Sequence, residues 1–87
     1  MSTHTAARVA IAINDGASRV KAVEVAGGKF VHERGGGFWY EFPDRSRLCM
    51  SDRIAVALPP LDAAVWLQLS PRGRAGWTAP PDLEKPE

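Results

Sequence analysis

Few residues in this chain have the chemistry of a catalytic or metal site. His4, His32 and Cys49 are the residues that would supply nitrogen or sulfur to a metal, and none lies at a ligand spacing from another. His32 precedes Glu33, but neighbours on a strand point to opposite faces and do not meet as an acid–base pair. No serine lies in a nucleophile elbow, and no glycine-rich segment has the spacing of a phosphate loop. The sequence therefore predicts a chain that is not an enzyme and that needs no metal or cofactor.

The strongest signal for binding is the segment 34–42, which reads RGGGFWYEF. Several aromatic side chains in succession are costly to leave on a surface, and the glycines let another backbone approach closely. Tryptophan, tyrosine and arginine dominate protein–protein hot spots, and the same residues stack on nucleobases. The segment is therefore expected to form a binding face.

Alternation along this segment gives both of its faces aromatic side chains. Phe38, Tyr40 and Phe42 point one way on a strand, and Trp39 and Glu41 point the other way. A chain of 87 residues has one modest core, so at least one of the two sets is expected near solvent or against a partner. We expect the first set to be partly core and Trp39 to be exposed.

Two functions from different classes follow from these residues. The first is a non-catalytic protein–protein interaction module, a small regulator or inhibitor that docks on a larger protein or complex in a bacterial or mobile-element setting. The alternative is a nucleic-acid-binding β-barrel that holds phosphates with arginine and stacks bases on aromatic rings. A homodimer is compatible with both. The predicted binding residues are Arg34, Trp39, Tyr40, Glu41, Arg45, Arg47 and Arg53.

Composition and charge set the outer limits. The formal charge is +1, with +3 over residues 1–79 and −2 over residues 80–87, and eight of the eleven basic residues are arginine. This balance permits nucleic acid but does not require it. No uninterrupted apolar run is longer than five residues, as in 9–13 and 54–58, which is too short to cross a bilayer. With one cysteine and no signal-peptide pattern at the N-terminus, we expect a cytoplasmic chain without membrane contact.

Period-two alternation dominates the elements that must position the binding residues. Residues 8–14 read RVAIAIN and residues 53–58 read RIAVAL, which predicts two strands with branched side chains on one face and alanine on the other. Residues 20–26 and 29–34 are expected to form a hairpin across Gly27-Gly28. That register places Phe30 and His32 on the same face.

The remaining strands are predicted at 37–42, 47–50, 64–69 and 74–78, with a turn at 43–46. The sequence thus favours an all-β fold, a small antiparallel barrel or sandwich of about seven short strands. The alternative is an α+β domain with one short helix at 60–69. The expected organisation is a flexible N-terminus over 1–7, a single β domain over 8–79, and a disordered tail rich in proline and acidic residues over 80–87.

Overall fold

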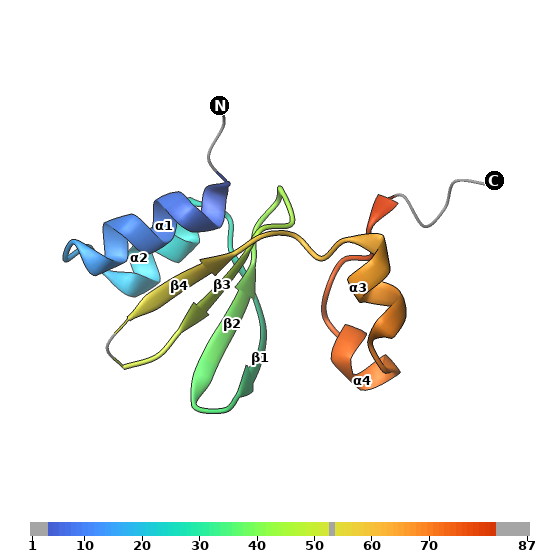
Figure 1. The fold of residues 1–87 in the computed structure, drawn as a ribbon. Helices are drawn as coiled ribbons and strands as arrows, with labels where there is room; N and C mark the ends of the chain where they lie inside the picture. The colour runs from blue at the N-terminus through green and yellow to red at the C-terminus, as the bar shows by residue number, and fades with distance from the viewer. Residues whose placement is uncertain (1–3, 53, 82–87) are drawn as a thin grey trace.

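The computed structural model describes residues 4–52 and 54–81, and there the chain forms an α+β fold. Two helices come first, followed by an antiparallel sheet of order β1-β2-β3-β4 and two short helices (Figure 1). The predicted all-β barrel or sandwich is therefore wrong, and the alternative α+β domain fits. The elements are α1 (Thr5–Asn14), α2 (Arg19–Val25), β1 (Lys29–Arg34), β2 (Gly37–Glu41), β3 (Arg47–Met50), β4 (Ala55–Leu58), α3 (Ala63–Gln68) and α4 (Pro71–Arg74).

The predicted strand at 8–14 is part of helix α1. Ala6, Val9, Ala10 and Ile13 are buried, which is the i, i+3, i+4, i+7 spacing of one helix face. Ile11, which a strand would place beside Val9 and Ile13, is instead 67% exposed. Alanine is the best helix former, and the abundance of alanine in this segment favours the helix over the alternating pattern.

The predicted strand at 20–26 is also helical, and Gly27-Gly28 ends helix α2 instead of turning a hairpin. Ser18 caps the start of α2 by accepting a hydrogen bond from the Lys21 amide. At the other end, Gly27 has φ +80° and donates to the Glu24 carbonyl, while Gly28 donates to the Val23 carbonyl. This pair of bonds is a Schellman motif, which needs the left-handed conformation that glycine adopts most easily.

Four of the predicted strands are present, each within a residue or two of the predicted range. They lie at 29–34, 37–41, 47–50 and 55–58. Gly35-Gly36 joins the first two with positive φ at both residues, as a two-residue hairpin requires. Alternation over short segments bounded by turn residues therefore predicted these four strands correctly, although not the open sheet that they form.

A bulge at Val31 changes which residues of β1 share a face. Phe30 pairs with Tyr40 and His32 pairs with Trp39, so the register shifts by one residue between them. Phe30 and His32 therefore lie on opposite faces of the sheet, and the prediction that they share a face is wrong. Bulges of this kind redirect side chains and are common beside functional sites.

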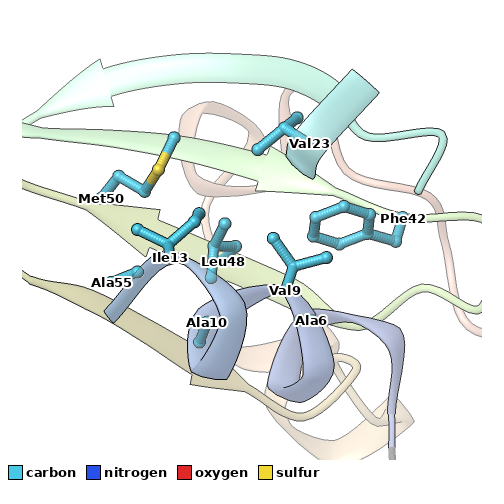
Figure 2. Close-up of a cluster of buried hydrophobic side chains, with 9 residues drawn as sticks. All are labelled: Ala6, Val9, Ala10, Ile13, Val23, Phe42, Leu48, Met50 and Ala55. Carbon is cyan, nitrogen blue, oxygen red and sulfur yellow. The ribbon is translucent and has the colours of Figure 1, made fainter. Parts of the chain in front are cut away.

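The hydrophobic core lies between helices α1 and α2 and one face of the sheet. Figure 2 shows side chains of both helices meeting those of β3, β4 and the end of β2. Leu48 and Ala6 are fully buried at the centre of this layer. We call this side of the sheet the helical face. The buried side chains of the core between this face and the two helices are Ala6, Val9, Ala10, Ile13, Val23, Phe42, Leu48, Met50 and Ala55.

The chain after β4 crosses to the other side of the sheet and forms α3 and α4, far from α1 and α2 in Figure 1. The strands predicted at 64–69 and 74–78 are absent there. Asp62 caps α3 by accepting from the Val65 amide at 2.8 Å, and Ser70 caps α4 with Pro71 at its first turn. These caps start helices where alternation alone suggested strands.

Candidate functional site

Three of the predicted binding residues hold the C-terminal segment, residues 59–81, against the molecule. The Glu41 carboxylate, 6% exposed, accepts hydrogen bonds from the Thr78 amide at 2.9 Å and the Thr78 hydroxyl at 2.6 Å. Arg47 Nε donates to the Pro59 carbonyl at 2.8 Å, and Arg45 donates to the Leu61 carbonyl. Each of these side chains forms hydrogen bonds within the chain, although all three were predicted to contact a partner.

The C-terminal segment brings Trp77 onto the face of the sheet opposite the helical face. Its ring meets those of Trp39 and His32 edge to face, with centroids 6.1 and 5.8 Å away. The Arg47 guanidinium lies over the Trp77 ring at 5.7 Å. Trp39 is therefore half-buried under Trp77, whereas the sequence predicted that it would be exposed.

A pocket of about 240 Å³ lies beside these rings. We call it the cationic pocket. Arg34, on the same face of β1 as His32, lines it together with Arg47. The bulge at Val31 places His32 and Arg34 there, and apolar side chains from the C-terminal segment close the opposite wall. Arg34, Trp39 and Arg47 of the predicted set thus meet at one site.

The electrostatics of the cationic pocket are one-sided, because no carboxylate is among its lining residues within the described part of the chain. Burial, and then the positive charge of Arg34, lower the pKa of His32, so its ring is neutral at pH 7. Burial also lowers the pKa of Arg47, while nearby Glu41 opposes that change. His32 Nδ1 is buried and has no hydrogen-bond partner among the described residues.

A second surface lies on the helical face, where the two helices leave the sheet partly uncovered. We call it the aromatic patch; it consists of Phe30, Phe38 and Tyr40. The Phe30 ring is 6.4 Å from that of Phe38 and 5.6 Å from that of Tyr40, measured between centroids. Phe30 is 53% exposed and Phe38 is 41% exposed, while Tyr40 is half-buried. Phe42, at the end of the same face, is buried under the helices.

The predicted site residues therefore do not form one surface. Tyr40 belongs to the aromatic patch, Arg34 and Trp39 line the cationic pocket, and Glu41 bonds to the C-terminal segment. Arg53 lies outside the described residues, as does the predicted tail from residue 82 onward.

Sequence reasoning missed Phe30, His32 and Trp77 as members of these surfaces. Phe30 and His32 were predicted to share a face, and only the bulge separates them. Trp77 lies 38 residues beyond Trp39, which it contacts, so local pattern gave no sign of the pairing.

Comparison with protein-family models, with curated proteins and with solved structures finds no match for this chain. Within residues 4–52 and 54–81 there is no cluster of three or more histidine, cysteine, aspartate or glutamate side chains suited to a metal ion. None of the helices in that part of the chain is long and apolar enough to cross a membrane.

Proposed function

We propose that this chain is a non-catalytic protein-binding module that docks on a larger protein through the aromatic patch. The observation that carries this proposal is the contact of three aromatic rings on an open part of the sheet. Isolated exposed apolar residues are common on soluble proteins, but contiguous patches with a polar rim mark interaction sites. Aromatic residues also contribute strongly to hot spots at such interfaces.

A hollow beside the patch supports a protein as the partner. It has a volume of about 260 Å³ and lies between α2 and the first two strands, with Phe30, Tyr40 and Val20 among its lining residues. Arg19 and Glu24 also line it, which gives the hollow one side chain of each charge. An apolar centre with a mixed polar rim is the usual anatomy of a protein–protein interface.

The alternative function, nucleic-acid binding, has less support. It assigned phosphates to arginines that include Arg45 and Arg47, both of which donate to backbone carbonyls of the C-terminal segment. A phosphate would have to compete with these internal bonds. Glu33 pairs with Phe38 across the first two strands and adds a negative charge beside the patch. Both features favour a protein partner.

The proposal is tested by comparing a Phe30→Ser, Phe38→Ser variant with an Ile11→Ser control. Ile11 is also strongly exposed but lies on α1, outside the patch. Affinity capture from cells would use each protein with and without nuclease. We expect wild type and the control to retain the same protein partner after nuclease treatment and the double variant to lose it.

Hydrogen exchange on the reconstituted complex locates the contact. We expect protection of the amides of residues 29–34 and 37–41 in the complex. A partner retained equally by the double variant would refute the aromatic patch as the docking surface. A catch that disappears with nuclease would support nucleic-acid binding instead.

A further inference from the structure

The cationic pocket has features that the proposed docking function does not use. It lies on the face of the sheet opposite the aromatic patch. A partner bound to the aromatic patch therefore leaves the cationic pocket open. Its walls combine rings from His32, Trp39 and Trp77 with apolar side chains that include Leu69. Small-molecule sites typically have such apolar and aromatic walls with a few polar groups that orient the ligand.

The charges of the pocket select for an anion. Arg34 and Arg47 line it, and no carboxylate is among its lining residues in the described part of the chain. Within residues 4–52 and 54–81, Arg34 has no ion pair and no side-chain hydrogen bond, so its donors remain available. Glu41, the acidic residue that pairs with Arg47 across β2 and β3, already contacts Thr78 and Lys29. Arginine forms forked contacts with carboxylates.

The size of the pocket limits the apolar part of the ligand. A buried cavity of about 150 Å³ holds a benzene ring, and this pocket has about 240 Å³. One aromatic ring with a small anionic group therefore fits. Edge-to-face contact with tryptophan favours an aromatic ring over an aliphatic chain.

The bulge at Val31 also shapes the cationic pocket. It turns His32 and Arg34 toward Trp39, and Gly76 makes close packing over the bulge possible. A Cβ atom at Gly76 would lie 2.7 Å from Val31 Cγ1, and Gly76 has φ +86°. The Nδ1 atom of His32 is buried without a partner among the described residues, which is uncommon for a polar atom.

We propose that the cationic pocket binds a small aromatic carboxylate, with the anion held by Arg34, beside the positive charge of Arg47, and the ring against the tryptophans. This binding function is independent of the docking function proposed above, because the two surfaces lie on opposite faces of the sheet. Failure of one proposal therefore leaves the other standing.

The test is a titration of the isolated chain with benzoate, followed by backbone and indole N–H signals in NMR spectra. Benzamide, which has nearly the same shape but no charge, is the matched ligand control. A ligand this small is expected to bind with a Kd of about 1 mM. We expect saturable shifts at the Trp39 and Trp77 indoles, and binding of benzamide weaker by about tenfold.

Arg34→Gln tests the cationic contact, and Arg72→Gln is the control because Arg72 is exposed on α4 and does not line the pocket. We expect Arg34→Gln to weaken benzoate binding by about tenfold and Arg72→Gln to leave it unchanged. Equal binding of benzamide and benzoate, equal effects of the two variants, or no saturable shift at the two indoles would overturn the proposal.

Discussion

The carboxylate of Asp44 accepts a hydrogen bond from the backbone amide of Thr5 at 2.8 Å, across 39 positions of sequence. Thr5 begins α1, and the residue before it, His4, makes no side-chain cap. Ser46 accepts from the next amide, Ala6, at 2.9 Å. The turn between β2 and β3 therefore caps the first helix, which supplies much of the core.

Asp44→Asn should destabilise the fold by about 1 kcal/mol, because an amide has one acceptor oxygen and cannot accept from both the Thr5 and the Ser46 amides. Thr5 would lose a charged acceptor at the positive end of the helix dipole. Asp52→Asn is the control, since Asp52 is exposed and its carboxylate accepts no hydrogen bond within the described residues. The free energy of unfolding, measured in urea, should fall for Asp44→Asn and not for Asp52→Asn.

The same carboxylate should make the free energy of unfolding depend on pH in the acidic range. Burial raises the pKa of Asp44, but hydrogen bonds from Ser46 and Thr5 outweigh burial and hold it well below its ordinary value of 3.8. The unfolded chain therefore binds more protons on acidification than the folded chain does. The stabilisation is present above pH 3.8 and is lost as the pH falls below that value.

Urea unfolding of wild type and Asp44→Asn across this range isolates the contribution of Asp44. The difference between the two proteins should be constant near neutral pH and shrink in acid. His32 has a lowered pKa in both proteins, so its effect cancels in the comparison. A difference that stays constant down to about pH 2 would contradict the assignment.

Gly37 and Cys49 should be coupled energetically. A Cβ atom at Gly37 would lie 2.7 Å from Cys49 Sγ, while the next nearest atoms are 3.6 Å away. Gly37→Ala should therefore cost about 1–3 kcal/mol in wild type and much less in a Cys49→Ala background. A double-mutant cycle on unfolding free energies should give a coupling of about 1 kcal/mol or more. Additive effects would show that the sulfur atom is not the obstacle.

Glu41→Ala should release the C-terminal segment without unfolding the sheet. It removes both hydrogen bonds to Thr78, and bonds to a charged acceptor are worth about 1.5–3 kcal/mol. Hydrogen exchange in residues 63–78 should rise about tenfold or more, while β2 and β3 keep their protection. Glu24→Ala, on the exposed side of α2, is the control. A loss of protection throughout the sheet would instead make Glu41 part of the main fold.

Turn chemistry and alternation predicted the four strands of the sheet, but they also predicted strands in segments that are not strands. Gly35-Gly36 fits a two-residue hairpin, and the short segments on either side alternate as strands do. The same alternation failed for α1, because a segment of valine, isoleucine and alanine satisfies the strand and the helix spacing together. At Gly27-Gly28 the failure was similar, since glycine pairs end helices as well as turn hairpins.

The sequence by itself determined where the four strands lie and which segment carries the aromatic side chains. Only the tertiary structure decided what those side chains face. The bulge at Val31 separates Phe30 from His32, and Trp77 returns across the sheet to cover Trp39. Backbone groups of the C-terminal segment form hydrogen bonds with Glu41, Arg45 and Arg47. The physical reason is that period and propensity act between neighbours in sequence, whereas a polar atom takes whichever partner the folded chain brings to it.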